Sequence, residues 1–370
     1  MNYFRKFFGG LDPYLMGAVA VLLGFGIVAL VSSSVARGTH DELTQGAAIA
    51  IGLVLLVILA LAHPKTVHRW RHPVALAAFF VMVAVLIFGR TVKGTRGWFF
   101  LGPLSFQPVE LAKIALIIVL ASILPLHARS RSLKAVISAS FVTAVFVALT
   151  LFQPDFGSAM ILIGLWCAML LVSGVPRRYV LILFIAAAAA GLLSWQFAFQ
   201  DFQKERVLIF LDPSRDPLGR GYNVTQAQIA VGSGGFWGAG FASGTQSQLR
   251  FLPESQTDFV FSLLAEELGF VAVTILIAAI VVVVWRLYRL ARAAPDDFSQ
   301  FVTVGAAALI SIESFIAIGG NIGLVPMTGI TLPFVSAGGS SMVAHLALIG
   351  LAQGVSRAAS RTASLHEGAA

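Results

Sequence analysis

An aspartate stands just before one of the longest apolar stretches of the sequence. The segment FLPESQTDFVFSLLAEELG continues without further charge to Trp285. A helix that begins near Asp258 places Ser262, Ala265 and Gly269 on the same face as the aspartate. Small residues beside an acid form either a close helix contact or the wall of a cavity. Asp258 can therefore cap the helix or act as a general base, and the residues alone leave both roles open.

Three further acids lie within apolar stretches of the same half of the chain, where charge is costly without a partner or water. Helical periodicity turns Glu267 to the side opposite Asp258 and Glu266 about a quarter turn away. We therefore expect these two glutamates to lie outside the site of the aspartate. Glu313, in SIESFIAIGG, is the acid that the sequence places deepest in an apolar stretch.

A glutamate and a lysine lie one helical turn apart in FQPVELAKIALII. Pro108 suits the first turn of a helix, and Glu110 lies where the helix dipole favours an anion. Lys113 follows three residues later on the same face. We expect a buried Glu110–Lys113 ion pair that either supports the fold or lines a polar cavity. Asp155, in the similar segment FQPDFGSAM, is explained equally well as a helix start or as a site residue.

The segment from about 198 to 257 carries cations that can bind a phosphate group. We select Lys204, Arg206 and Arg250, with solvated surface charge as the alternative for each. No His or Cys cluster has metal-ligand spacing, and neither a phosphate-binding loop nor a nucleophile elbow is present. Metal ligands, if the protein has any, are unknown at this stage.

These residues must be positioned by a membrane-embedded chain. Hydrophobic residues make up 58% of it and charged residues 11%, with a mean hydropathy of +0.89, whereas soluble domains are roughly a quarter charged. Apolar runs of about twenty residues predict about ten transmembrane helices. They lie near 14–34, 45–62, 73–90, 109–125, 135–153, 156–174, 178–197, 258–285, 300–322 and 341–357. The prediction is an all-α polytopic membrane protein with one membrane domain over residues 1–370 and a long outer loop, 198–257, between the seventh and eighth helices.

The positive charge indicates how the chain crosses the membrane. With ten spans, both termini and the even-numbered loops share one side, and that side carries most of the Lys and Arg. Cytoplasmic loops are the ones enriched in these residues, so both termini are predicted to be cytoplasmic. Topology thus explains the sequence pI near 10.1 without a nucleic acid partner. The long and irregular loops fall on the other side, and we expect the chemistry at the outer membrane boundary.

Several stretches together resemble the SEDS family of cell-wall polymerases. They are FQPVELAK, QPDFGSA, DPLGRGY, AVGSGG, GTQSQL, FLPESQTDFVFSLLAEELG and PFVSAGGSS. The resemblance runs in order from Leu11 to Ser341, and GTQSQLRFLPE with the short tails is similar to the elongation branch rather than the division branch. Two positions depart from the family pattern: Ala337 stands where relatives have tyrosine, and Thr331 where many have proline.

The resemblance implies peptidoglycan glycosyl transfer at the outer face of the bacterial inner membrane during cell elongation. The implied substrate is lipid II, a disaccharide-pentapeptide carried on undecaprenyl pyrophosphate. The implied partners are a class B penicillin-binding protein, which is a transpeptidase, and other proteins of the elongation complex. The essential aspartate of the family matches Asp258, and its intramembrane Glu–Lys pair matches Glu110 and Lys113. The family also makes a divalent cation, Mg²⁺, a candidate cofactor.

Such a reaction needs a base for the acceptor hydroxyl and positive charge for the departing pyrophosphate. Asp258 is the predicted base, and Lys113 or Arg206 the predicted source of charge. A flippase for the same lipid-linked precursor is the main alternative, because ten spans with intramembrane charges also suit a transporter and Glu313 lies deep. A scaffold for the cross-linking enzyme is the third possibility.

Overall fold

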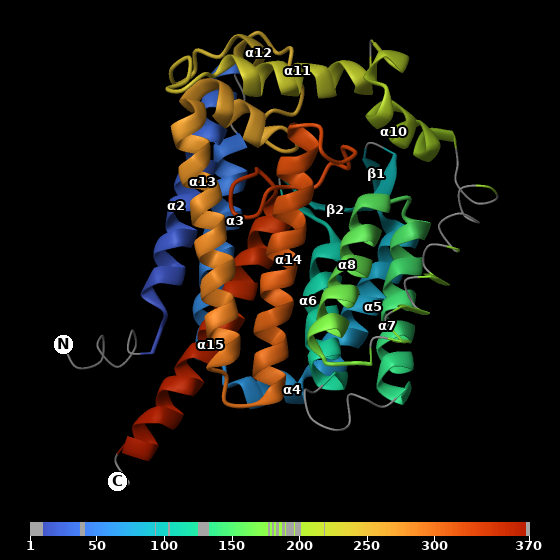
Figure 1. The fold of residues 1–370 in the computed structure, drawn as a ribbon, viewed down its shortest axis with the longest axis vertical. Helices are drawn as coiled ribbons and strands as arrows, with labels where there is room; N and C mark the ends of the chain where they lie inside the picture. Colours follow the sequence, from blue (N-terminus) through green and yellow to red (C-terminus); the bar gives the residue numbers. More distant parts are fainter. Residues whose placement is uncertain are drawn as a thin grey trace.

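The computed structural model describes residues 10–37, 41–92, 94–102, 104–124, 133–176, 201–217 and 219–367, with scattered residues between 178 and 196. Long apolar helices form a bundle, with one small sheet at its edge (Figure 1). Within the described part, seven helices are long and apolar enough to cross a membrane. These are α2 (Pro13–Arg37), α3 (Asp41–Leu61), α5 (Arg71–Phe88), α7 (Leu133–Phe152), α13 (Val260–Arg292), α14 (Asp297–Asn321) and α15 (Gly339–Glu367). The predicted all-α polytopic fold is confirmed.

Two further predicted spans form shorter helices. α6 (Pro108–Ile123) and α8 (Phe156–Val172) begin at the two Phe-Gln-Pro segments, as their sequences indicated. Most residues of α6 are buried, because this helix lies inside the bundle. The predicted span 178–197 lies largely outside the described residues.

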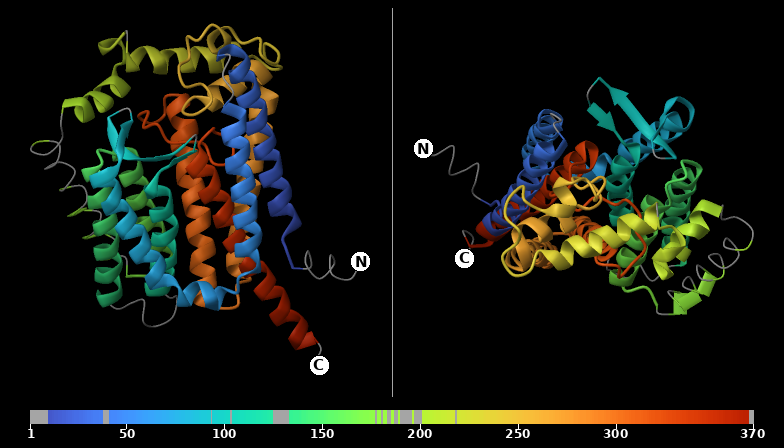
Figure 2. Two further views of the ribbon diagram at one scale, coloured as in Figure 1. Left: turned by 180° about the vertical axis from the view of Figure 1, so that it is seen from behind. Right: turned by 90° about the horizontal axis from the view of Figure 1, so that it is seen from above.

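The two ends of the bundle differ in character, as the views in Figures 1 and 2 show. One end carries the short helix α4 (Pro64–Arg69), the start of α2 and the end of α15. The opposite end carries the antiparallel sheet and the surface helices of the long loop. These elements are β1 (Arg90–Val92), β2 (Thr95–Leu101), β3 (Leu104–Phe106), α10 (Asp201–Leu211), η1 (Pro213–Arg215), α11 (Arg220–Ser233) and α12 (Thr245–Gln248). The irregular segments therefore gather at one end, as the sequence predicted.

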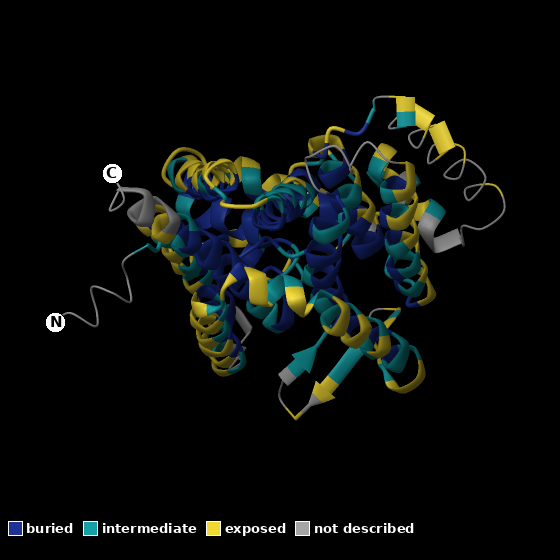
Figure 3. Ribbon diagram, turned by 90° about the horizontal axis from the view of Figure 1, so that it is seen from below, coloured by how far each residue is buried: buried dark blue, intermediate teal, exposed yellow. Residues whose placement is uncertain are grey.

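Glycines let α15 pack closely against α3. A Cβ added to Gly350 would lie 2.6 Å from the carbonyl oxygen of Leu56, and one added to Gly354 would lie 3.0 Å from that of Leu59. Small residues are what allow two membrane helices to approach this closely. Seen from below, buried residues fill the centre of the bundle and exposed ones surround it (Figure 3). Many of the exposed side chains are apolar, including Val54 and Phe80, as expected for surface that faces lipid.

A buried aspartate joins three helices at the α4 end of the bundle. Asp12 caps α2 by accepting from the N–H of Leu15 at 3.0 Å. Its other oxygen accepts from Nε and Nη2 of Arg286 in α13, at 2.8 and 2.6 Å. The Gln353 side chain of α15 bonds to the backbone N–H and carbonyl of the same aspartate. These hydrogen bonds fix the positions of α2, α13 and α15 relative to one another.

Two glutamates attach the loop around α12 to α13 and α2. Glu266 accepts from the backbone N–H groups of Gln246 and Ser247, at 2.7 and 3.0 Å. Glu267 accepts from Ser32 Oγ at 2.6 Å and from Gln248 Nε2 at 2.9 Å. Both glutamates are 1% exposed. As predicted, neither lies in the wall of the cavity that contains Asp258. We call Ser32, residues 245–248, Glu266 and Glu267 the glutamate clamp.

Candidate active site

A cavity of about 750 Å³ lies at the end of the bundle where the irregular segments gather. Asp258, Glu110, Lys113 and Asp155 all contribute to its wall. The sequence selected these residues from three separate motifs, and the fold brings them to one place. A volume of this size is typical of a site for a small ligand or for the head of a larger one.

Four of the described helices begin at this cavity. Gln107 precedes α6, Asp155 precedes α8, Phe259 precedes α13, and Gly338 precedes α15, and all four residues line the wall. The N-terminus of a helix carries partial positive charge and unpaired N–H groups. Converging N-termini therefore make the cavity suitable for an anionic group such as a phosphate.

Asp258 lies one residue before the N-cap position of the helix that follows it. α13 starts at Val260, and its N-cap is Phe259, which makes no capping hydrogen bond through its side chain. Asp258 itself lines the wall of the cavity. The backbone here is fixed by Asn321 of α14, whose Nδ2 donates to the Asp258 carbonyl at 2.9 Å and whose Oδ1 accepts from Ser262 Oγ at 2.7 Å. Sequence reasoning missed Asn321.

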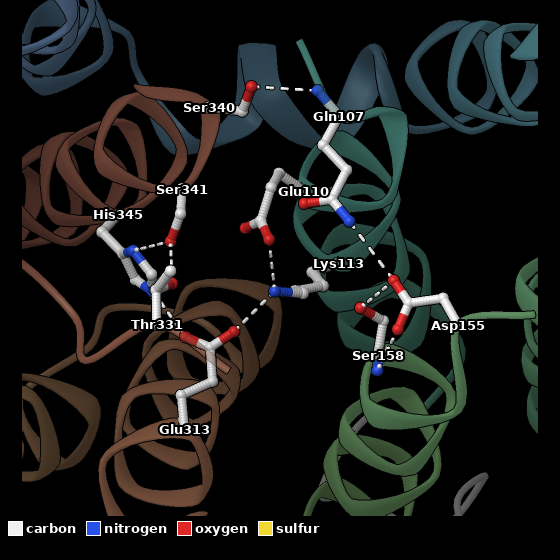
Figure 4. A network of polar contacts seen from close by, with 10 residues as sticks. All are labelled: Gln107, Glu110, Lys113, Asp155, Ser158, Glu313, Thr331, Ser340, Ser341 and His345. Atoms are coloured by element: carbon white, nitrogen blue, oxygen red, sulfur yellow. Dashed lines mark hydrogen bonds and ion pairs between the residues drawn. The ribbon is translucent and has the colours of Figure 1, made fainter. Parts of the chain in front are cut away.

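Lys113 lies between two carboxylates rather than one (Figure 4). Its Nζ donates to Glu110 Oε1 and to Glu313 Oε1, each at 2.7 Å. The second oxygen of Glu313 bonds to Nε2 of His345, and the other ring nitrogen of His345 contacts Ser341 Oγ at 3.2 Å. Lys113, Glu313 and His345 are each at most 3% exposed. The predicted Glu110–Lys113 pair is present, but as part of a larger network that joins α6, α14 and α15.

This network is not a source of positive charge for a ligand. Lys113 is balanced against Glu110 and Glu313, so two carboxylates already contact its single positive charge. The prediction that Lys113 itself stabilises a departing pyrophosphate is therefore not supported, and a role in positioning the cavity wall suits this geometry better.

Asp155 combines the two roles that the sequence left open. It caps α8 by accepting from the Ser158 N–H at 3.0 Å and from Ser158 Oγ at 2.7 Å. It also accepts from Gln107 Nε2, just before α6, at 3.2 Å, and lines the cavity. Asp155 thus fixes the starts of α6 and α8 relative to each other (Figure 4).

The glycine-rich segment before α15 forms another part of the wall. Ser340 Oγ donates to the Ser105 carbonyl and accepts from the Gln107 N–H, both at 2.9 Å, which ties α15 to β3 and α6. Thr331, one of the two departures from the family pattern, contacts Ser341 Oγ at 2.9 Å. Ala337, the other departure, donates its N–H to the Gln256 carbonyl at 2.8 Å. Both departures are thus accommodated in the wall.

Two of the three predicted phosphate-binding cations of the long loop are absent from the cavity wall. α10 contributes Ile209 and Phe210 to the wall, whereas Lys204 from the same helix does not line it. Arg250 is exposed and likewise absent from the wall. The fold therefore does not bring these two residues to the wall that Asp258, Glu110, Lys113 and Asp155 share. The side chain of Arg206 lies outside the described residues.

The comparisons with known proteins agree with this geometry. The family model for cell cycle proteins of the FtsW, RodA and SpoVE type matches residues 13–361. The chain belongs to this family. The peptidoglycan glycosyltransferase MrdB of Escherichia coli K12 is 35% identical over 345 residues, covering 93% of each chain. FtsW of Thiomicrospira cyclica is 34% identical over 362 residues, covering 95% of this chain and 92% of the relative.

Two solved structures share the fold of this FtsW/RodA/SpoVE member. A chain from a peptidoglycan synthase complex that coordinates polymerization and crosslinking has a TM-score of 0.81, with 33% identity over 94% of this chain and 98% of that one. The rod shape determining protein RodA of Thermus thermophilus has a TM-score of 0.69, with 29% identity over 94% and 97%. The SEDS resemblance read from the motifs, including its likeness to RodA, is confirmed.

Proposed function

We propose that this chain polymerises lipid II into glycan strands at the outer face of the bacterial inner membrane, with Asp258 as the general base. The chain is a peptidoglycan glycosyltransferase of the RodA type, in agreement with its relatives. One observation carries the assignment of the base: Asp258 lies in the wall of a cavity at which four described helices begin.

The reaction is a displacement at the anomeric carbon of the donor sugar. An acceptor hydroxyl forms the new C–O bond while its proton passes to the Asp258 carboxylate. The bond from the anomeric carbon to the pyrophosphate oxygen breaks, and the pyrophosphate leaves with the electron pair. A base positioned in this way typically contributes a factor of about a hundred or more to the rate.

The helix N-termini supply the positive potential that the pyrophosphate requires. α6 and α8 each place their own acid, Glu110 or Asp155, at the helix start, and Asp258 lies two residues before the first residue of α13. α15 has no acid in its first turn, and it begins at Gly339 on the cavity wall. We therefore assign the pyrophosphate to the N-terminus of α15, where backbone N–H groups favour an anion. Arg206 remains a candidate for additional charge.

A divalent cation is part of the proposal only together with the pyrophosphate. Among the described residues, no three His, Cys, Asp or Glu side chains come together as a metal site. Mg²⁺ is often held by one or two carboxylates and substrate phosphates, so Asp258 or Asp155 can contribute to such a site. The cation would neutralise the leaving group, and no step above depends on it.

A membrane-anchored transpeptidase is the proposed partner. The similar synthase complex coordinates polymerization with crosslinking, which supports a class B penicillin-binding protein beside this chain, together with other elongation-complex proteins. Both termini are proposed to be cytoplasmic, because the end of the bundle that carries α4 also carries the basic residues Lys65, Arg69, Arg286 and Arg289.

The test is polymerisation of labelled lipid II by the purified protein bound to its transpeptidase. Asp258→Asn should retain thermal stability and partner binding but turn over about a hundredfold more slowly or worse, because an amide cannot accept the proton. Asp258→Glu, which keeps a carboxylate, should retain measurable turnover. Glu205→Gln, on the exposed surface of α10, is the control and should behave as wild type. Near-normal turnover by Asp258→Asn would exclude the general-base role.

The same purified protein distinguishes the polymerase from the two alternative functions, flippase and scaffold. The flippase hypothesis rests on the deep position of Glu313, which is 1% exposed and paired with Lys113. Movement of lipid II across proteoliposomes without polymer would favour the flippase. Neither activity, with transpeptidase binding intact, would favour the scaffold.

A further inference from the structure

The network behind Lys113 returns to the wall of the active-site cavity through α15. Glu313 connects Lys113 to His345, and His345 in turn contacts Ser341 (Figure 4). Ser341 lines the cavity, as does Thr331, whose hydroxyl lies 2.9 Å from Ser341 Oγ. Glu313 and His345 are not part of the wall and are each 1% exposed. We call Glu313, His345, Ser341 and Thr331 the polar chain.

The fold holds the imidazole of His345 in one orientation. His345 follows Ser341 by four residues in α15, so the two side chains lie on the same helical face. Glu313 reaches the ring from α14, and the ring of Phe334 lies 5.4 Å from it, centre to centre. One ring nitrogen therefore faces a carboxylate, and the other faces the Ser341 hydroxyl at 3.2 Å.

The carboxylate sets the direction of the hydrogen bonds. An ionised carboxylate only accepts hydrogen bonds. Glu313 accepts from Lys113 Nζ through Oε1, and its Oε2 accepts from His345 Nε2. A neutral imidazole that carries its proton on Nε2 has an acceptor at Nδ1. The Ser341 hydroxyl therefore donates to His345 Nδ1.

This direction determines what the polar chain offers to a ligand. Ser341 has a single hydroxyl proton, and that proton is used by His345. Thr331 must then be the donor in its contact with Ser341. Both hydroxyls keep oxygen lone pairs but have no proton left for the cavity. This part of the wall therefore suits a hydrogen-bond donor, such as a sugar hydroxyl or an amide N–H, rather than an ionised phosphate oxygen.

We propose that Glu313 and His345 are positioning residues that keep Ser341 and Thr331 as hydrogen-bond acceptors for the sugar of the lipid-linked substrate. This inference rests on the proposed function, because it takes the substrate from that reaction. The pyrophosphate is assigned to the start of α15, and Ser341 is the third residue of that helix. The first sugar, which is bonded to the pyrophosphate, is the part of the substrate that comes next to Ser341. Thr331, a departure from the family pattern, supplies one of the two hydroxyls.

The first experiment determines which nitrogen of His345 carries the proton. The full-length protein with isotopically labelled histidine is studied by nitrogen NMR, and the signals of His345 are identified by their loss in His345→Gln. The wild type should show the Nε2–H tautomer. Glu313→Gln should convert it to the Nδ1–H tautomer, because a glutamine whose oxygen faces Lys113 offers an N–H to Nε2. An Nδ1–H or doubly protonated ring in the wild type, or no change in Glu313→Gln, would overturn the assigned direction.

The second experiment compares two ligands with the same polyprenyl pyrophosphate, one with the sugar and peptide portion and one without. These are lipid II and polyprenyl pyrophosphate, and their equilibrium binding to the protein in nanodiscs is measured. Ser341→Ala should weaken lipid II binding about three- to tenfold, the effect of one lost hydrogen bond, and leave polyprenyl pyrophosphate unaffected. Thr331→Val, which keeps the shape of the side chain, should do the same. Ser360→Ala, at the exposed far end of α15, is the matched control and should bind both ligands normally.

Glu313→Gln separates positioning from a general structural role. It leaves Ser341 in place but turns its hydroxyl from an acceptor into a donor. Binding of lipid II should therefore weaken about three- to tenfold, while binding of polyprenyl pyrophosphate stays equal or becomes tighter. A distorted cavity would instead weaken both ligands. Equal weakening of the two ligands in Glu313→Gln, Ser341→Ala and Thr331→Val, or no weakening of lipid II, would overturn the proposal.

Neither experiment requires turnover, so the inference and the proposed function fail separately. A wild-type protein that makes no polymer, but whose Ser341→Ala variant loses affinity for lipid II alone, would refute the polymerase and retain the sugar contact. A wild-type protein that polymerises normally, with Ser341→Ala and Thr331→Val equal to Ser360→Ala for both ligands, would refute the sugar contact alone.

Discussion

Lys113 is the residue whose environment differs most from what the sequence indicated. A two-residue pair would make Glu110 and Lys113 equally important to stability, because removing either leaves the other charge buried. In the structure Lys113 has two carboxylate partners, Glu110 and Glu313. Loss of one carboxylate therefore leaves an ion pair, whereas loss of the lysine leaves two buried carboxylates.

We accordingly expect unequal effects within the network. Lys113→Met should lower the free energy of unfolding by about 3–5 kcal/mol, the range for breaking a buried ion pair. Glu110→Gln and Glu313→Gln should each lower it by only about 1–2 kcal/mol, because Lys113 keeps one partner. The triple change Glu110→Gln, Lys113→Met and Glu313→Gln should recover much of the loss. Thermal and denaturant unfolding in detergent measure these differences, and equal effects of Glu110→Gln and Lys113→Met would contradict the three-residue arrangement.

The partners of Lys113 show what the sequence can predict about the site and what it cannot. Glu110 was predicted because it lies three residues away on the same helix, where periodicity fixes the geometry. Glu313 was noticed as a deep acid, but its contact with Lys113 spans 200 residues and depends on how α14 packs against α6. His345 gave no signal in its motif. Its role follows only from the position of α15.

At the scale of elements, α13 is divided by a glycine. Gly269 has φ +76°, a conformation that residues with a side chain rarely adopt, and a Cβ there would lie 2.2 Å from the backbone nitrogen of Gly238. Glu266 and Glu267 of the glutamate clamp lie just before Gly269 in the chain. Hydrogen bonds from Phe270 to Gly235 and from Ala239 to Glu266 continue the attachment of the loop. The start of α13, with Asp258, is therefore held from the loop side as well as by Asn321.

Breaking the clamp should affect stability more than chemistry. Glu267→Ala removes an acceptor from the buried Ser32 hydroxyl and from the part-buried donors of Ala242 and Gln248, and about 1–3 kcal/mol is expected for each buried donor left unsatisfied. Glu205→Ala, an exposed acid on α10, should change stability little. At a temperature where Glu267→Ala is folded, its turnover should fall far less than that of Asp258→Asn. A variant of full stability that lacks turnover would instead place Glu267 in the chemistry.

At the scale of the whole molecule, the opposite characters of the two ends lead to a topology prediction. A fluorescent-protein reporter fused after Ala294, between α13 and α14, should be active in the cytoplasm, as should one fused after Lys65 in α4. An alkaline phosphatase reporter fused after Ser243 should be exported and active. The predicted basic loop near Ser130 lies outside the described residues. Ala294 and Lys65, which the structure describes, therefore serve to test the same side of the membrane. Reversed results at Ala294 and Ser243 would place the site on the wrong side of the membrane.

Most of the fold could be predicted because the membrane leaves few options for the backbone. Apolar runs placed nine of the spans close to observed helices, and the Phe-Gln-Pro segments marked the starts of α6 and α8. The sequence left Lys204 and Arg250 between phosphate binding and solvated surface charge, since loop cations carry no periodicity that gives their direction. The apolar cavity between α3, α5 and α15 likewise leaves no local signature in the sequence, because its wall combines residues from five helices.

The border that the two cavities share has a consequence for inhibitor design. Since Glu110 and Ser340 line both the polar active-site cavity and an apolar cavity of about 430 Å³ between α3, α5 and α15, one compound that joins a diphosphate mimic to a branched alkyl chain would reach both at once. Tethering raises the effective concentration of the second group, so such a compound should bind far more tightly than either fragment.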